Sequence, residues 1–339
     1  MNDNSDQRGP VLVAGGAGFL GSHLCKRLVG EGYKVICLDN LQTGRRENVK
    51  PLLNNPLFSL LLHDVVDPIP VKTPLTHIYN LACPASPRHY QADPVHTLRT
   101  CVYGAYNLLE LARKNDARIL QASTSEVYGN PHVHPQSESY RGNVNMVGLR
   151  SCYDEGKRCA ETLFVDYGAR QHLSVKIARI FNTYGPGMSE SDGRLVSNLI
   201  LQALHGHKLT IYGDGSQTRS LCYVDDMIEG LVRLMKSPAS FRGPVNLGNP
   251  QESSVLDIAG LISKLVGADP SFEFLPLPSD DPEQRCPDIL LARRHLEWQP
   301  AIGLESGLRK TIRYFALVRR AHARIYAQDR QENQQNASF

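Results

Sequence analysis

The first 180 residues alternate short apolar runs with longer segments in which apolar residues recur at helical spacing. The runs predict strands at residues 11–14, 34–38, 58–62, 76–82, 118–122 and 174–180. Between them, the stripe of Leu20, Leu24 and Leu28 predicts one helix, and similar stripes predict helices over 95–113 and 153–170. Strands that alternate with helices favour parallel βαβ units with helices on both faces of the sheet. We therefore expect an α/β fold with a doubly wound parallel sheet.

The second half of the chain loses this regular alternation after Phe181. Helical patterns remain over 196–205 and 224–235, and residues 245–247 predict a short strand that returns to the main sheet. Residues 251–320 carry patterns for two or three further helices between proline-rich loops. We expect a first domain over 10–182, which the segment near 221–247 rejoins. A smaller second domain is expected over 183–220 and 248–320. Residues 1–9 and 322–339 are expected to be flexible tails.

Composition and charge narrow the possible partners. The 339 residues include 37 Lys and Arg against 34 Asp and Glu, and this net charge of +3 does not favour nucleic acid or an anionic membrane as the main partner. No apolar stretch is long enough for a bilayer-spanning helix, and residues 1–9 lack the apolar core of a signal peptide. The eight cysteines form no CxxC pair and no zinc-site spacing, so we expect reduced thiols, no metal site and a cytoplasmic protein.

A glycine-rich turn separates the first expected strand from the first expected helix. Its spacing, GxxGxxG over 15–21, suits a tight turn, a close approach of a pyrophosphate at Gly18 and close packing of the helix on the sheet. Asp39 ends the next strand, where its carboxylate can accept hydrogen bonds from ribose hydroxyls and repel a 2′-phosphate. The pattern predicts a dinucleotide site that favours NAD, although Arg45 and Arg46 leave NADP open.

Two polar segments carry candidate acid–base chemistry. Tyr153 and Lys157 are four residues apart, so their side chains share one face of a helix. A lysine ammonium favours the phenolate, and the tyrosine could then remove a proton from a sugar hydroxyl while a hydride leaves the same carbon. The polar run that follows the strand over 118–122 contains Thr124, which can hydrogen-bond the reacting hydroxyl, and Glu126, which adds a carboxylate beside it.

Longer motifs show that the sequence resembles the extended short-chain dehydrogenase/reductases, and among them the UDP-glucuronate decarboxylases, also called UDP-xylose synthases. The resemblance runs from about residue 10 to residue 318. GxxGxxG and YxxxK mark only the superfamily. The narrower motifs are STSEVYG at 123–129, CYDEGKR at 152–158 and QRCPDI at 284–289. Other matching segments are GGAGFLGSH at 15–23, HDV at 63–65, PASP at 84–87, ARIFNTYGP at 178–186, DGRLVSN at 192–198, SQTRS at 216–220 and VNLGNP at 245–250.

The resemblance implies a Rossmann-like first domain with tightly bound NAD, and a substrate-binding second domain that takes UDP-glucuronate. Tyr153 and Thr124 would help transfer a hydride from sugar C4 to NAD, with Lys157 tuning the tyrosine and holding the nicotinamide ribose. The 4-keto group then lies β to the C6 carboxylate, so CO2 can leave. Protonation of C5 and return of the hydride to C4 would give UDP-xylose. Ser125 and Glu126 match family residues near C5 and the departing carboxylate.

The resemblance also assigns binding residues and a homodimer. The implied cofactor-binding residues are Gly15, Gly18, Phe19, Leu20, Gly21, Asp39, Asn40, Thr43, Gly44, Asp64, Val65, Leu81, Thr100, Tyr153 and Lys157. The implied substrate-binding residues are Arg99, Asn107, Asn182, Arg194, Tyr212, Arg219 and Arg285, and Arg285 is also a catalytic candidate because its guanidinium suits a sugar acid. The helices over 95–113 and 153–170 match those of the family's dimer interface, although their apolar stripes could equally be core.

Five positions depart from the family pattern. They are Cys101 for a usual Asn, Arg141 for Trp, Met146 for Pro, Gly187 for Arg and Cys286 for Lys. Arg141 and Met146 precede Tyr153 closely enough that we expect them to affect the sugar pocket. Two alternatives therefore stay open at this point: a 4-epimerase or 4,6-dehydratase of the same family, and a nucleotide-sugar-binding protein without turnover. A dehydratase is expected to have an Asp-Glu pair in place of Ser125 and Glu126.

Overall fold

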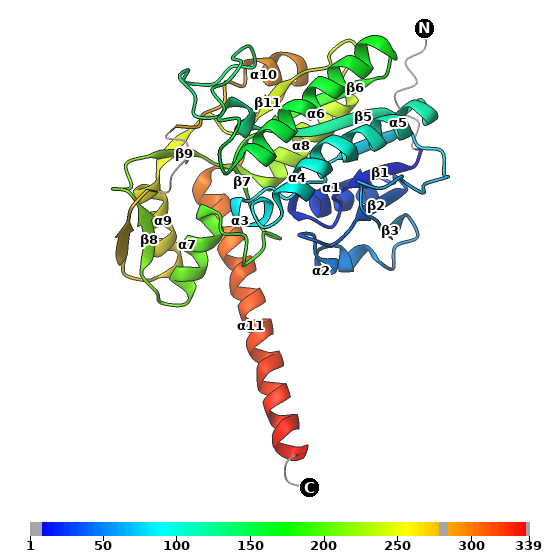
Figure 1. Cartoon of the computed structure of the whole chain (residues 1–339). Coiled ribbons are helices and arrows are strands. Elements are labelled where there is room, and N and C mark those ends of the chain that lie inside the picture. Colours follow the sequence, from blue (N-terminus) through cyan, green and yellow to red (C-terminus); the bar gives the residue numbers. More distant parts are fainter. Residues whose placement is uncertain (1–8, 278–283, 337–339) are drawn as a thin grey trace.

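A seven-stranded parallel sheet forms the centre of the computed structural model, which describes residues 9–277 and 284–336, with side chains described as far as residue 321 (Figure 1). The strand order is β11-β6-β5-β4-β1-β2-β3, and every neighbouring pair is parallel. The strands are β1 (Val11–Ala14), β2 (Val35–Asp39), β3 (Phe58–Leu62), β4 (His77–Asn80), β5 (Arg118–Thr124), β6 (Val175–Ile180) and β11 (Val245–Leu247). The order reverses between β1 and β4, and the carboxyl edge at such a reversal forms a crevice.

Most helices lie between successive strands, where the apolar patterns predict them. The longer helices are α1 (Phe19–Gly30), α5 (Ala105–Asn115), α6 (Ser151–Arg170), α7 (Leu195–Leu204), α8 (Val224–Lys236), α9 (Val255–Val266) and α11 (Leu304–Asn336). The shorter elements are α2 (Arg46–Val49), α3 (Pro87–Tyr90), α4 (Pro94–Arg99), α10 (Leu290–Leu296), the 3-10 turns η1 (Lys50–Leu52) and η3 (Ser125–Tyr128), and the π-helical turn η2 (Thr100–Gly104).

Helices cover both faces of the sheet, which confirms the doubly wound prediction. On one face α1 and α8 pack together and share a buried cluster with Val11 and Val13 of β1. On the other face α5 and α6 share a second cluster with Leu12 and Ala14. Successive side chains of a strand point to opposite faces. A strand between two helical layers must therefore be apolar throughout, and each residue of β1 is at most 1% exposed.

The segment expected to form one helix over 95–113 is divided into α4, η2 and α5. Asp93 caps α4, because its carboxylate accepts the His96 backbone N–H at 2.9 Å. A π-helical turn often marks a functional site, and Thr100 of η2 reaches the cleft described below. Pro87 starts the short helix α3, because the backbone N–H that proline lacks would have no partner at the first position of a helix.

The smaller part of the molecule lies to one side of the sheet and contains α7, α9 and three pairs of short strands (Figure 1). The pairs are β7 (Thr183–Tyr184) with β10 (Cys222–Tyr223), β8 (Leu209–Tyr212) with β13 (Phe272–Leu275), and β9 (Thr218–Ser220) with β12 (Glu252–Ser254). The expected boundary needs one correction, because α10 packs against α8 and β11 of the main sheet. Trp298, just after α10, also donates its indole N–H to the Asp226 carbonyl at 2.9 Å.

The last helix, α11, packs its first turns against α7 and α9 and then extends away from the sheet (Figure 1). The expected tail over 322–339 needs a correction, because α11 continues to Asn336. The segment is polar, but it is rich in Ala, Arg, Gln and Glu, which are good helix formers. Its polarity was therefore not a reason to expect the helix to end. Residues 1–8 and 337–339 lie outside the described residues. Within the described ranges, no helix is both long and apolar enough to cross a bilayer.

Candidate active site

A cleft of about 730 Å³ runs along the carboxyl edge of the sheet. Residues at the ends of β1, β2, β4, β5 and β6 line one wall, and residues of α7, β8 and β9 line the other. The cleft contains every residue assigned to the cofactor and the catalytic candidates Thr124, Ser125 and Glu126. It also contains most of the substrate candidates, namely Asn182, Arg194, Tyr212, Arg219 and Arg285. Candidates that are up to 270 positions apart in the sequence therefore meet in one cavity.

Two substrate candidates lie elsewhere, which corrects their assignment. Arg99 is exposed, and its guanidinium lies over the ring of Tyr103, 6.0 Å from the centroid. The Asn107 amide donates to the carbonyl oxygens of Val65 and Val66 at 2.9 and 3.0 Å. This amide therefore holds the loop after β3 in place, and neither side chain lines the cleft. The family match identified both positions, but the faces of α4 and α5 on which they lie direct them away from it.

The glycine-rich turn has the geometry that a dinucleotide needs. Gly15 has a positive φ of 74°, and a Cβ there would lie 2.7 Å from the backbone of Leu81, so only glycine fits. Gly18 is the N-cap of α1, and no described side chain caps this helix end. Backbone N–H groups of an uncapped first turn, together with the helix dipole, favour a phosphate group. The residues present therefore fit a dinucleotide pyrophosphate.

Asp39 is held rigidly at the end of β2. Its carboxylate accepts backbone N–H groups from Ala17 at 2.9 Å and Leu41 at 2.8 Å, which tie the glycine-rich turn to the next loop. Burial raises the pKa of Asp39, while these backbone hydrogen bonds and a third from Gly18 lower it. Asp39 lines the cleft, and its carboxylate oxygens keep lone pairs for further donors, such as ribose hydroxyls.

Tyr153 lies deep in the cleft with Lys157 beside it on α6. The Lys157 ammonium donates to the Ala122 carbonyl at 2.9 Å and lies 5.8 Å from the centre of the Tyr153 ring. Tyr90 stacks on the other side, with ring centroids 5.1 Å apart and planes 4° apart. Burial raises the pKa of Tyr153 well above its usual value, and the hydrogen bond with Thr124 only partly opposes this. That Lys157 favours the phenolate of Tyr153 stays a prediction.

Glu126 is at the centre of a buried ionic cluster. Arg285 binds it with both terminal nitrogens, one of them 2.7 Å from Oε2, and Arg150 donates to the same oxygen at 2.5 Å. The three side chains are 9–16% exposed. Burial disfavours the ionised carboxyl, but the charges of Arg285 and Arg150 hold the pKa of Glu126 below its usual range. The carboxylate is thus ionised and shared between two guanidiniums.

Asp154 borders this cluster and has no ion pair with any residue in the described part of the chain. Its Oδ1 is buried and has no hydrogen-bond partner among the described residues. Burial and the negative charge of Glu126 raise the pKa of Asp154 to about 7, against the opposing effect of Arg150 and Arg285. Below that pH the side chain is therefore mostly neutral.

Asp154→Asn is expected to become more stabilising as pH rises. The folded pKa of about 7 exceeds the ordinary 3.8, so the folded state holds a proton that the unfolded state loses. Between the two pKa values, the free energy of unfolding of the wild type therefore falls as pH rises, by up to about 1.4 kcal/mol per pH unit. Asparagine does not titrate, so it removes this fall. Urea unfolding at pH 5 and pH 8 measures the difference, with the exposed Asp166→Asn on the same helix as control. An equal difference between Asp154→Asn and wild type at both pH values would contradict the assignment.

The positions that depart from the family pattern mostly lie outside the cleft. Arg141 and Met146 do not line it, so the expectation that they shape the sugar pocket is wrong, and Met146 is 75% exposed. Cys101 is buried behind the wall, with its sulfur 3.3 Å from that of Cys83. Gly187 does line the cleft, close to the ring of His23. Of these substitutions, Gly187 is therefore the one placed to alter what the cleft binds.

Three residues of the site were missed by the sequence reasoning. Arg150 and Tyr90 line the cleft, and Asp154 lies just behind it. Arg150 and Asp154 lie close to Tyr153 in the sequence. Two ionisable residues so near a catalytic candidate could have been predicted to belong to the site. Tyr90 had no such signal, because only the fold brings α3 against α6.

Comparison with known proteins identifies the family. Residues 11–248 match the model of the NAD dependent epimerase/dehydratase family. The chain belongs to this family. It is 52% identical over 305 residues to UDP-glucuronic acid decarboxylase 1 of Arabidopsis thaliana, which covers 90% of this chain and 69% of the relative. It is also 52% identical over 305 residues to UDP-glucuronic acid decarboxylase 1 of Xenopus tropicalis, and this match covers 90% of this chain and 72% of the relative.

Comparison with a solved structure supports the fold. The chain is similar to UDP-glucuronic acid 4-epimerase from Bacillus cereus in complex with UDP-glucuronic acid and NAD, with a TM-score of 0.81 and 28% identity. The match covers 91% of this chain and 99% of that structure. The resemblance to extended short-chain dehydrogenase/reductases is therefore confirmed.

Proposed function

We propose that the protein decarboxylates UDP-glucuronate to UDP-xylose through a cycle of oxidation and reduction at sugar C4 with bound NAD. The observation that carries this proposal is the meeting, in one cleft, of a proton-transfer set and a buried cluster suited to a sugar acid. Tyr153, Lys157 and Thr124 form the first, and Glu126 with Arg150 and Arg285 forms the second. The relatives named as decarboxylases support the same reaction.

The glycine-rich turn, Asp39 and Lys157 are the groups we assign to NAD. The turn and α1 would hold the pyrophosphate, Asp39 the adenosine ribose and Lys157 the nicotinamide ribose. Asn40, Thr43, Gly44, Asp64, Val65, Leu81 and Thr100 complete the assigned set. When bound, NAD supplies the hydride acceptor at C4 and, once reduced, the hydride donor. Its positive nicotinamide ring would also oppose the burial that raises the pKa of Tyr153.

Tyr153 takes the proton of the C4 hydroxyl in the first step, while Thr124 holds that hydroxyl by a hydrogen bond. The C4 ketone then accepts the electron pair of the C5–C6 bond as an enolate when CO2 leaves. A proton adds to C5, and after hydride return Tyr153 gives its proton back to the C4 oxygen. The net reaction consumes one proton and releases one CO2, with no net change in the cofactor. Ser125 and Glu126 are the side chains we assign to the C5 and carboxylate end.

Arg285 is the guanidinium that we assign to the carboxylate of the substrate. It lines the cleft beside Glu126, and its buried Nε–H has no hydrogen-bond partner among the described residues. A carboxylate such as that of glucuronate is the acceptor that a guanidinium binds best. The diphosphate and uridine would be held on the other wall, where Asn182, Arg194, Tyr212 and Arg219 line the cleft.

Asp39 should decide the choice between NAD and NADP. Asp39→Ala is expected to weaken NAD binding by about 1.5–3 kcal/mol, because it removes acceptors to the ribose hydroxyls. Asp39→Asn removes the charge but keeps the size of the side chain and one acceptor oxygen, for either Ala17 or Leu41, which bond different oxygens of the carboxylate. It should reduce the discrimination against NADP, because the charge that repels a 2′-phosphate is gone. Calorimetric titration of both cofactors measures these changes, and equal affinity of the unchanged protein for NAD and NADP would contradict the assignment.

We also propose a homodimer through the face of α4, η2, α5 and α6. This face carries large apolar side chains that are each at least 42% exposed, namely Val95, Leu98, Tyr103, Tyr106 and Val165. An apolar surface of this kind favours association. Sedimentation velocity of the purified chain tests it, and a monomer at micromolar concentration would contradict it.

Product identification tests the proposed reaction. The protein is incubated with UDP-glucuronate, and the nucleotide sugars are separated and identified. UDP-xylose and CO2 are the expected products. UDP-galacturonate without CO2 would instead indicate a 4-epimerase, and unchanged UDP-glucuronate with measurable binding would indicate a protein without turnover.

A further inference from the structure

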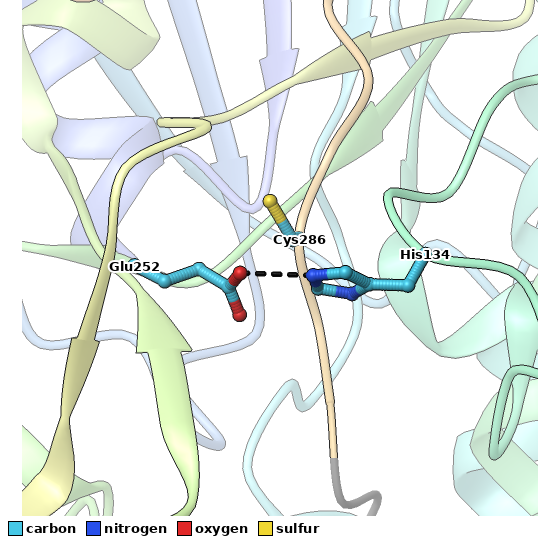
Figure 2. A group of neighbouring side chains, drawn as sticks. All are labelled: His134, Glu252 and Cys286. Atoms are coloured by element: carbon cyan, nitrogen blue, oxygen red, sulfur yellow. Dashed lines mark hydrogen bonds and ion pairs between the residues drawn. The ribbon is translucent and has the colours of Figure 1, made fainter.

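His134, Glu252 and Cys286 meet at a second place, outside the cleft (Figure 2). Their nitrogen, oxygen and sulfur atoms all lie within 4.8 Å of one another, and His134 Nε2 is 2.9 Å from Glu252 Oε2. Figure 2 shows the three side chains approaching from three separate segments. Imidazole nitrogen, carboxylate oxygen and thiolate sulfur are the ligands that zinc prefers.

We propose that His134, Glu252 and Cys286 form a Zn²⁺ site. Bonds of about 2.0–2.3 Å to a shared ion place tetrahedral ligand atoms roughly 3.3–3.6 Å apart. The His134 and Glu252 atoms, 2.9 Å apart, would therefore separate slightly, and no pair would have to approach by more than about 1.5 Å. On binding, the hydrogen bond between His134 and Glu252 is replaced by metal bonds, a Zn–S bond forms, and the Cys286 thiol proton passes to solvent. No electron transfer is involved.

The backbone around the three ligands is already fixed. Gln136 N–H donates to the Cys286 carbonyl at 2.8 Å, and Cys286 N–H donates to Gln136 Oε1 at 2.9 Å, so the segments of His134 and Cys286 are joined. Glu252 lies in β12, paired with Ser220 of β9. Such a frame lowers the cost of ordering a site when the ion arrives.

Two of the three ligand atoms contact each other, while Cys286 Sγ donates to the Pro250 carbonyl at 3.3 Å, a hydrogen bond that is lost when the thiol gives up its proton to bind zinc. Thr218 donates its hydroxyl to Glu252 Oε1 at 2.5 Å, which orients the carboxylate and leaves Oε2 toward His134. Cys286 is 5% exposed, whereas the His134 and Glu252 side chains are 38% and 24% exposed. The exposed side gives the ion a path from solvent and room for water as a fourth ligand.

The site adjoins the Glu126 cluster through the chain itself. Cys286 directly follows Arg285, which holds Glu126 with both terminal nitrogens. An ion on Cys286 would therefore fix the backbone that positions this guanidinium. The resemblance predicts lysine at position 286, so the third ligand is a feature in which this chain departs from the family pattern. The zinc site does not depend on the proposed reaction.

Cobalt binding to the purified full chain tests this site directly. Co²⁺ occupies zinc sites, and a thiolate bound to Co²⁺ gives a charge-transfer band in the near ultraviolet. The wild type should show this band, and Zn²⁺ should remove it by displacement. Cys286→Ser should lose the band, and His134→Gln should weaken Co²⁺ binding by more than the roughly 10–100-fold that loss of an outer partner costs. Cys159→Ser, which removes an exposed thiol of α6, is the matched control and should keep it.

Thermal unfolding provides a second, independent measurement. Zn²⁺ should raise the unfolding temperature of the wild type and of Cys159→Ser, because it binds the folded state, but not that of Cys286→Ser. Far-ultraviolet circular dichroism checks that each variant is folded, and the exposed His134→Gln replaces Cys286→Ser if the latter is not. A folded wild type without the cobalt band, or a band that survives in Cys286→Ser, would overturn the proposal.

Discussion

Tyr153→Phe is expected to reduce the rate of CO2 release by about 10²–10⁴-fold while UDP-glucuronate still binds. The substitution keeps the ring that stacks on Tyr90 and removes only the oxygen that exchanges the C4 proton. The loss should appear in kcat, because the proton is transferred in the transition state and not in substrate binding.

Single-turnover kinetics and calorimetric titration of UDP-glucuronate separate the two quantities. Tyr167→Phe is the matched control, since Tyr167 lies on the same helix and its hydroxyl instead donates to Glu110 at 2.7 Å. That variant should keep the wild-type rate. A wild-type rate in Tyr153→Phe would remove the phenol from the mechanism.

The second large effect concerns Glu126. Glu126→Gln leaves the guanidinium of Arg285 buried against a neutral amide, and loss of one partner of a buried ion pair typically costs about 3–5 kcal/mol. Asp154 partly offsets this cost, because the charge of Glu126 contributes to its raised pKa. We therefore expect a loss near the lower end of that range at pH 7, together with slower CO2 release.

Urea unfolding and CO2 release from the same preparations measure both effects. Glu155→Gln is the control, because Glu155 is on the neighbouring helix turn and forms a more exposed pair with Arg158 at 3.5 Å. It should change neither quantity appreciably. Unchanged stability of Glu126→Gln would mean that the two arginines do not depend on this carboxylate.

Strand ends are the part of the site that the sequence predicted well. Asp39 and Thr124 each close an apolar run, and parallel strands bring such positions to one edge, so their meeting followed from the pattern alone. Tyr153 and Lys157 followed in the same way from helical spacing. The positions of these residues could be predicted because they depend on contacts within a strand, a helix or the order of the sheet.

Contacts between distant loops could not be predicted. The bond from Arg285 to Glu126 joins residues 159 positions apart, and no local pattern encodes that distance. The same holds for the zinc ligands, which are drawn from three segments and therefore escape a search for local spacing. Arg99 and Asn107 show the opposite error, because a matched position says nothing about which way a side chain faces.

The balance of CO2, UDP-xylose and NADH in a single reaction tests the central claim most directly. The protein is incubated with excess UDP-glucuronate in heavy water, and the three quantities are measured together with deuterium at C5. The account predicts equal amounts of CO2 and UDP-xylose, deuterium at C5, and NADH far below either, because the cofactor is reoxidised in the same cleft within each turnover. Release of a 4-keto pentose with one NADH for each CO2, or NADH without CO2, would contradict it.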